Sequence, residues 1–340
     1  MGLNGILKNN SIRTLLILTV LALFFSCEEE KKKGPTLSKP KKKKIAISRP
    51  EFNADSAYAF IAKQVAFGPR VPNTEAHVMA GNYLSSKLQS YGFEMIEQKA
   101  VVKAYDGKKL NMKNIIGQHK KHLNNRILLF AHWDSRPIAD QDDEDRDQAI
   151  DGANDGASGV GILLEVARQI QAKDPEIGID IIFFDAEDYG QPIDAPGKRL
   201  PGTWCLGSQY FAKNPHRANY SANFGILLDM VGAKHATFTK EAISRYYAAP
   251  VVDKVWDIAA SLGHSDYFVP QETTHVGDDD HVYINKFLKI PSIDIIQYYS
   301  PTGGFAPHWH THDDTMDIID KNTLTAVGET VLATVFQEAP

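Results

Sequence analysis

The chain has 340 residues, 43% of them hydrophobic and 23% charged, with a formal net charge of −5. A chain of this length and composition can bury a large core and falls in the ordinary globular class. Eight lysines crowd into residues 31–44, so the rest of the chain is more acidic than the total suggests. These features argue against a nucleic acid partner, because no basic binding face is apparent.

The first 27 residues predict a targeting segment that is not part of the fold. Lys8 and Arg13 precede an apolar run over residues 15–25, which is typical of a signal peptide and too short to span a bilayer comfortably. Ser26 and Cys27 close the run in the pattern of a bacterial lipobox, in which the cysteine receives lipid. We expect residues 1–27 to be a lipoprotein signal peptide, with the exported protein anchored in the bacterial cell envelope. An ordinary secretory signal with an incidental cysteine is the alternative.

Residues 28–44 predict a charged, disordered tether, because their glutamates, lysines and prolines cannot bury apolar surface. Residues 45–340 then form one folded domain, since they show no internal repeat and no second break in composition. If Cys27 is lipidated, Cys205 has no disulfide partner, and we expect it to be a buried thiol.

Apolar periodicity predicts alternating helices and strands, which makes the fold α/β. Two nearly continuous apolar runs, residues 127–130 and 179–184, are typical of central strands covered by helices on both faces. The expected helices lie near residues 54–67, 74–91, 156–172, 249–263 and 321–337. The expected strands cover residues 95–103, 113–118, 127–131, 179–184, 224–228 and 292–296.

Five short segments that follow or adjoin these runs end in residue types that bind zinc. Ligands in open α/β sheets lie where strands end, so separate segments can form one site. Imidazole and carboxylate are common zinc ligands, and a carboxylate beside a ligand can move protons. We therefore interpret the chain as a zinc enzyme. The residues concerned are His132, Asp134, Asp155, Glu187, Asp188, Asp229 and His310.

Each carboxylate segment also has a structural alternative. Asp155 lies among small residues that let the backbone approach an ion closely, although it could serve only as a helix N-cap. Glu187 and Asp188 follow a buried strand, where two adjacent carboxylates repel each other unless a cation or a shared proton offsets the charge. A solvated acidic turn is the alternative for this pair.

The remaining candidates are less specific. His310 lies in a His-rich tract that could be a surface metal patch. Asp134 could orient the imidazole of His132, or either could make only local hydrogen bonds. Asp229 ends an apolar run, and the acidic run at residues 278–280 could instead interact with the dipole of a helix near residues 281–286.

The ordered motifs resemble the zinc aminopeptidase superfamily over roughly residues 50–338. They are residues 132–134, 151–155, 184–188, 228–232 and 310–314. Three details are similar to the zinc-dependent glutaminyl-peptide cyclotransferases in particular: Trp309 before His310, the Asp279-Asp280-His281 step, and a long loop from Tyr189 to Trp204. The resemblance implies a single domain with a central mixed, mostly parallel twisted sheet flanked by helices.

The resemblance also implies site roles and a reaction. Asp155, Asp188 and His310 would bind one Zn²⁺, and Glu187 would be the general acid/base, with Asp229 and Asp280 in its acidic network. The enzyme would convert the N-terminal glutamine of peptides or proteins to pyroglutamate and release ammonia. Animal secretory cyclases have glutamate where this chain has Asp188, and the shorter arm could shift ligand geometry.

Three aromatic residues could form an apolar pocket that excludes water during the reaction, although ordinary packing explains them equally well. They are Trp204, Phe305 and Trp309.

Two rival functions are compatible with the sequence. In a two-zinc metalloaminopeptidase, His132, Asp155 and Asp229 would hold a second ion and Glu187 would activate water. A catalytically silent surface lipoprotein that binds peptide or metal is the other rival, but such a protein does not need the acid/base residue Glu187.

Overall fold

The two central strands are buried along their whole length and apolar at most positions. Every residue of β3 (Arg126–His132) and β4 (Gly178–Phe184) is buried. Successive side chains point to opposite faces, and both faces are apolar, so a covering layer is required on each side of the sheet.

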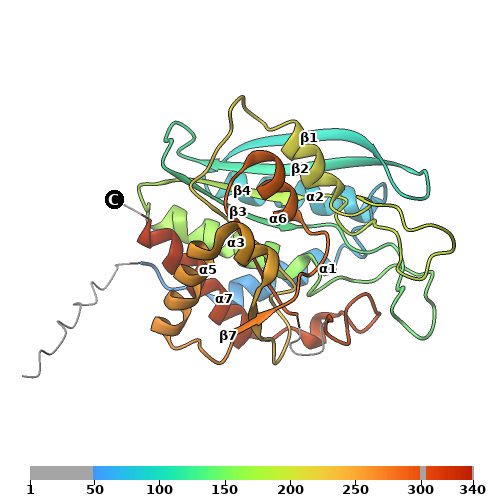
Figure 1. Cartoon of the computed structure of the whole chain (residues 1–340). Coiled ribbons are helices and arrows are strands. Elements are labelled where there is room, and N and C mark those ends of the chain that lie inside the picture. The colour runs from blue at the N-terminus through green and yellow to red at the C-terminus, as the bar shows by residue number, and fades with distance from the viewer. Residues whose placement is uncertain (1–48, 299–303, 339–340) are drawn as a thin grey trace, which may run out of the picture. The chain divides into compact units, whose positions relative to one another are not determined.

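A six-stranded mixed sheet contains these strands, in the order β1-β2-β4-β3-β5-β8 (Figure 1). Parallel pairing joins β4 to β3, β3 to β5 and β5 to β8, whereas β1 to β2 and β2 to β4 are antiparallel. The predicted mixed, mostly parallel α/β fold is therefore confirmed. The other strands are β1 (Glu94–Lys103), β2 (Lys109–His119), β5 (Gly225–Asp229) and β8 (Ser292–Ile296).

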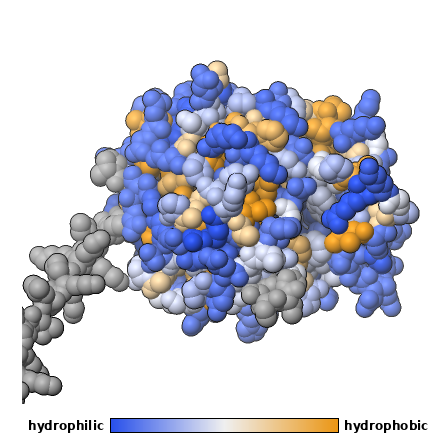
Figure 2. Space-filling model, in the orientation of Figure 1, coloured by the Kyte–Doolittle hydropathy of each residue, from blue (hydrophilic) through white to orange (hydrophobic). Residues whose placement is uncertain are grey.

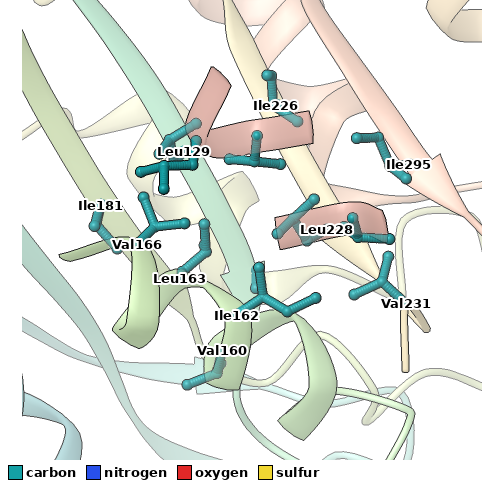
Figure 3. Packing of buried hydrophobic residues seen from close by; sticks show 14 of the residues in the cluster. Leu129, Val160, Ile162, Leu163, Val166, Ile181, Ile226, Leu228, Val231 and Ile295 are labelled. Atoms are coloured by element: carbon teal, nitrogen blue, oxygen red, sulfur yellow. The ribbon is translucent and has the colours of Figure 1, made fainter. Parts of the chain in front are cut away.

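Five helices cover one face of the sheet, and their apolar residues form the larger core with it. α1, α3, α5 and α7 contact one another beneath the sheet (Figure 1). Figure 3 shows Leu163 and Val166 of α3 beside Leu129 of β3 and Ile181 of β4. The helices are α1 (Ala54–Val65), α2 (Glu75–Ser90), α3 (Ala157–Ala172), α5 (Ala242–Leu262) and α7 (Lys321–Gln337).

Shorter elements cover the opposite face. Leu128, Phe130 and Ile182 point to this side and pack with Phe211 of α4 (Leu206–Lys213) and Ile284 of a π-helical turn, Ile284–Leu288. That turn follows the short helix α6 (Asp280–Tyr283). The prediction that helices cover both faces of the central strands is confirmed.

Several boundaries differ from the predictions. α5 begins at Ala242 rather than near residue 249, and it is kinked, with non-helical dihedrals at Ala248 two residues before Pro250. Proline removes a helical hydrogen bond, which explains both the kink and the late predicted start. The helix named near residues 281–286 as an alternative is present as α6 and the π-helical turn. Apolar periodicity did not predict α4 or a separate two-stranded sheet of β6 (Phe238–Glu241) and β7 (Phe268–Thr273).

The computed structural model describes residues 49–298 and 304–338, which belong to one compact unit. The predicted signal peptide, Cys27 and tether lie outside the described residues. Within those two ranges, no helix combines the length and the apolar character needed to cross a membrane. On the face seen in Figure 2, apolar areas lie between hydrophilic ones.

Candidate metal centre

Strand ends bring the candidate ligands together. His132 is the last residue of β3 and Asp229 the last residue of β5, while Glu187 and Asp188 follow β4 by three and four residues. These strands are parallel neighbours, so their carboxyl ends lie at one edge of the sheet. Asp155 reaches the same edge from the loop before α3.

Two groups of side chains share Asp155. His310 Nε2 lies 3.1 Å from Asp188 Oδ1 and 3.7 Å from Asp155 Oδ2. On the other side of Asp155, His132 Nε2 lies 2.9 Å from Asp155 Oδ1 and 3.2 Å from Asp229 Oδ1. All five residues are buried or nearly so.

The first group fits a zinc ion by chemistry and by spacing. Zinc bonds of about 2.0–2.1 Å in tetrahedral geometry place neighbouring ligand atoms roughly 3.3 Å apart. The distances from His310 Nε2 to the two carboxylates fall on either side of that value. In addition, Asp188 Oδ2 is buried without a hydrogen-bond partner among the described residues, as expected of an atom that serves a cation.

Glycines let the Asp155 loop pass close to its neighbours. A Cβ on Gly156 would lie 2.6 Å from the carbonyl oxygen of Asp134, and one on Gly159 would lie 2.1 Å from that of Leu228. Gly156, which is the N-cap of α3, also has a positive φ of 87°. The alternative that Asp155 merely caps the helix is wrong, because no side chain caps α3.

Two further aspartates hold the backbone of the ligand segments. Asp314 accepts the N–H groups of Asn154 (2.7 Å) and Asp155 (3.0 Å). Asp134 accepts the N–H groups of Glu187 (3.1 Å) and Asp188 (3.2 Å). Asp134 therefore positions the acidic pair, and its contact with His132 Nδ1 is longer, at 3.6 Å.

A buried chain of charges that the sequence did not predict orients His310. Asp140 Oδ1 lies 3.1 Å from His310 Nδ1 and accepts a hydrogen bond of 2.7 Å from Arg136 Nε. Arg136 Nη1 also donates to the Asp188 carbonyl oxygen at 2.7 Å. Burial raises the pKa of Asp140, but its contact with His310 and the hydrogen bond from Arg136 outweigh burial and hold that pKa below its usual value.

Glu187 lies at the edge of the ligand set, with its side chain 12% exposed. Burial raises its pKa well above the usual value; His132 opposes this shift, and the neighbouring Asp188 and Asp280 add to it. The Cys205 thiol, buried as predicted, donates to Glu187 Oε1 at 3.1 Å. A solvated turn, the alternative for Glu187 and Asp188, is wrong because Asp188 is buried and only 12% of the Glu187 side chain is exposed.

The acidic residues assigned to the Glu187 network lie in different places. The hydrogen-bond partner of Asp229 is His132, whose Nε2 lies 3.2 Å from Asp229 Oδ1. Asp280 is fully buried, and it is Asp279 that lines the cavity beside Glu187. Asp279 also caps α6 by accepting the Asp280 N–H. The alternative that the acidic run at residues 278–280 interacts with the start of a helix is therefore confirmed for Asp279.

The ligand group opens into a cavity of about 470 Å³ with aromatic walls. The Trp204 ring stacks on His310, with centroids 5.7 Å apart and an interplanar angle of 14°. The Cζ atom of Arg136 lies 4.4 Å from the centroid of the Trp204 ring. Trp309 stacks on Phe305 at 4.3 Å. All three predicted aromatic residues therefore line one cavity with Asp155, Glu187, Asp188 and His310.

Arg70 is another supporting residue that the sequence did not predict. Its buried guanidinium donates to the carbonyl oxygens of Asp151 and Gly152, both at 2.6 Å, and so fixes the loop before Asp155. No sequence signal distinguishes Arg70, Arg136 or Asp140, because their partners are carbonyl groups and side chains that only the fold brings near.

Comparisons with known proteins agree with this geometry. The model of peptidase family M28 matches residues 114–335. A glutaminyl cyclase from Tannerella forsythia has 55% sequence identity and a TM-score of 0.82, covering 84% of this chain and 99% of that one. A Bacteroides thetaiotaomicron glutaminyl cyclase bound to N-acetylhistamine has 51% identity and a TM-score of 0.83, covering 85% of this chain and 99% of that one.

A curated relative with a different activity also matches. Aminopeptidase YwaD of Bacillus subtilis is 26% identical over 79% of this chain. The chain spans about half of that relative's length, 54%.

Proposed function

The chain belongs to peptidase family M28, and we propose that within it the protein is a zinc-dependent glutaminyl-peptide cyclotransferase. Its substrates would be peptides or proteins with an N-terminal glutamine, and its products pyroglutamyl peptides and ammonia. The likeness to two glutaminyl cyclases at 51% and 55% identity, each covered over 99% of its length, supports this activity over the aminopeptidase activity of the 26% identical relative.

One structural observation carries the proposal. Glu187 lies in the same aromatic-walled cavity as Asp155, Asp188 and His310. A substrate whose side-chain amide approaches the three ligands therefore has its α-amine within the same small space as a carboxylate. Cyclisation joins two groups of one residue, so holding them in this arrangement supplies much of the rate enhancement.

Asp155, Asp188 and His310 would hold the zinc ion. When bound, zinc acts as a Lewis acid that polarises the carbonyl of the glutamine side chain. Asp140 would keep the His310 ring oriented, because its carboxylate lies 3.1 Å from His310 Nδ1 and leaves Nε2 facing the other ligands.

Glu187 would move the proton. The α-amine attacks the side-chain carbonyl carbon, forming the ring C–N bond, and Glu187 accepts the proton that this nitrogen loses. The bond from that carbon to the amide nitrogen then breaks, and Glu187 returns the proton so that ammonia leaves. The aromatic walls exclude water, which would otherwise compete as the nucleophile.

A mass-spectrometric comparison tests the activity. Purified protein is incubated with a Gln-initiated and a Leu-initiated peptide, and the bound zinc is counted on the same sample. We expect loss of ammonia from the Gln peptide only, with about one zinc ion per chain. Release of the first residue, above all from the Leu peptide, would contradict the proposal.

The alternative of a two-zinc aminopeptidase rests on the second group of side chains. His132, Asp155 and Asp229 are close enough to hold a metal ion, and they share Asp155 with the first group. In that case about two zinc ions per chain would bind and Glu187 would activate water. The zinc count and the peptide products together separate the two activities.

We propose in addition that the protein is exported and anchored to the membrane by lipid on Cys27, facing the periplasm or the cell surface. The apolar run at residues 15–25 followed by Ser26-Cys27 supports this localisation. The variant Cys27→Ser should be recovered in the soluble fraction after export, whereas the parent protein sediments with membranes. Equal membrane association of both would contradict the lipid anchor.

A further inference from the structure

Two exposed apolar side chains lie at the mouth of the catalytic cavity. Ile193 is 61% exposed and Leu200 is 45% exposed, and both line the cavity. Single exposed apolar residues need no explanation, but two on one loop that border the same cavity indicate a binding surface. Val276, from the segment before α6, lines the cavity as well.

The loop that carries these residues is held in place by its own polar contacts. Gln191 is buried, and its Oε1 accepts the Leu200 N–H at 2.7 Å. The Gln191 N–H in turn donates to Thr203 Oγ1 at 3.2 Å. A ligand that contacts Ile193 and Leu200 therefore meets a loop already ordered, which reduces the entropy cost of binding.

Covalent continuity determines what occupies this surface. In the proposed reaction the N-terminal residue lies beside Glu187, at the closed end formed by the buried ligands. The next Cα along the substrate is only about 3.8 Å away, so the second residue has to leave through the open part of the same cavity. A volume of about 470 Å³ is large enough for more than the glutamine alone.

We propose that Ile193 and Leu200 form an apolar subsite for the second residue of the substrate, so that the enzyme prefers glutamine followed by a large aliphatic or aromatic residue. This inference rests on the proposed cyclotransferase function. A charged second side chain gains no comparable contact, because it would have to exchange water for apolar surface. Arg199 and Asp278, which also line the cavity, carry opposite charges. The other carboxylates of the lining are buried or nearly so, and they are Asp155, Glu187, Asp188, Asp229 and Asp279.

Two peptides that differ only in the second residue, Gln-Leu-Ala and Gln-Gly-Ala, test the subsite. We expect kcat/KM, measured by ammonia release, to be about tenfold higher for the leucine peptide. In the double variant Ile193→Ser with Leu200→Ser, this ratio should fall to about two, chiefly through a higher KM for the leucine peptide. Each single variant should give an intermediate ratio.

Val101→Ser is the matched control, because Val101 is 64% exposed on β1 and does not line the catalytic cavity. It should leave the tenfold ratio intact, and thermal unfolding should confirm that all variants fold. Equal kcat/KM for both peptides in the parent enzyme would overturn the subsite alone. A double variant with an unchanged ratio, or one that slows both peptides equally, would also overturn it. Absence of ammonia from every Gln peptide would overturn the proposed function and the subsite together.

Discussion

The two ends of β4 each carry a buried aspartate, in opposite circumstances. Near the start of the strand, Asp180 is fully buried and receives hydrogen bonds from Arg126 (2.6 and 2.7 Å), Tyr220 (2.8 Å) and Gln118 (3.1 Å). After the end of the strand, Asp188 is equally buried, but its Oδ2 has no hydrogen-bond partner among the described residues. Asp188 Oδ1 does have partners, His310 Nε2 at 3.1 Å and Arg136 Nη1 at 3.8 Å. Buried charge is tolerated when it is paired, so protein groups satisfy both oxygens of Asp180, whereas Asp188 keeps one oxygen available to a metal ion.

The backbone shows the same difference. No residue within β4 has a positive φ, whereas Ala186, Cys205 and His310 have φ values of 54°, 57° and 56°. Such conformations cost about 1–3 kcal/mol each for residues other than glycine and persist only where the surroundings impose them. These residues with positive φ and the Asp188 oxygen without a hydrogen-bond partner therefore lie after the end of β4, around the ligand group, and none of them lies within the strand.

The largest expected effect comes from removing the charge of Asp188. Asp188→Asn should abolish zinc binding and turnover, because an amide oxygen is a much weaker ligand than a carboxylate. The metal-free variant should be no less stable than the metal-free parent, since burial and then the repulsion from Asp155 raise the pKa of Asp188 and disfavour its charge. Zinc analysis and urea unfolding after chelation measure both. If the metal-free variant were clearly less stable than the metal-free parent, Asp188 would stabilise the fold as Asp180 does, and the contrast between the two ends of β4 would be wrong.

Glu187→Gln should lower kcat by about 10²–10⁴-fold while zinc remains bound. The substitution keeps the shape of the side chain but removes its ability to accept a proton. Steady-state kinetics and a zinc count on the same preparation test this. Retained turnover would remove Glu187 from the acid/base role.

At the other end of the strand, Asp180→Asn should cost about 3–5 kcal/mol of unfolding free energy, because Arg126 would be left buried without a counter-charge. Tyr220→Phe is a milder companion that keeps the ion pair and should cost about 1.5–3 kcal/mol. Zinc content and kcat per folded molecule should be unchanged in both. If either variant lost zinc while still folded, the two ends of β4 would not be independent.

Asp140→Asn should weaken zinc affinity about 10–100-fold, because the carboxylate orients the His310 ring. Asp142→Asn is the matched control: Asp142 Oδ2 contacts His312 Nδ1 at 2.8 Å, and His312 belongs to neither ligand group. Competition with a chelator measures both affinities. Equal zinc affinity in the two variants would show that the Asp140 contact is dispensable.

The sequence predicted the elements whose apolar residues form a continuous run or recur with a clear helical period. The apolar runs of β3 and β4 and the long periodic helices α1, α2, α3 and α7 were found within a few residues of their ends. Elements that depend on neighbours were missed: β6 and β7 are short strands that form a separate two-stranded sheet, and α4 has only eight residues. Their stability comes from tertiary contacts, which leave little trace in local sequence.

The sequence by itself determined the chemistry of the site, because Asp155, Glu187, Asp188 and His310 carry their donor atoms wherever the chain places them. Only the tertiary structure decided which of these atoms meet, since strand order brings the ends of β3, β4 and β5 to one edge. It also decided their support. Arg136 and Asp140 look like parts of a solvated charged loop, and they orient His310 only because folding buries them against it.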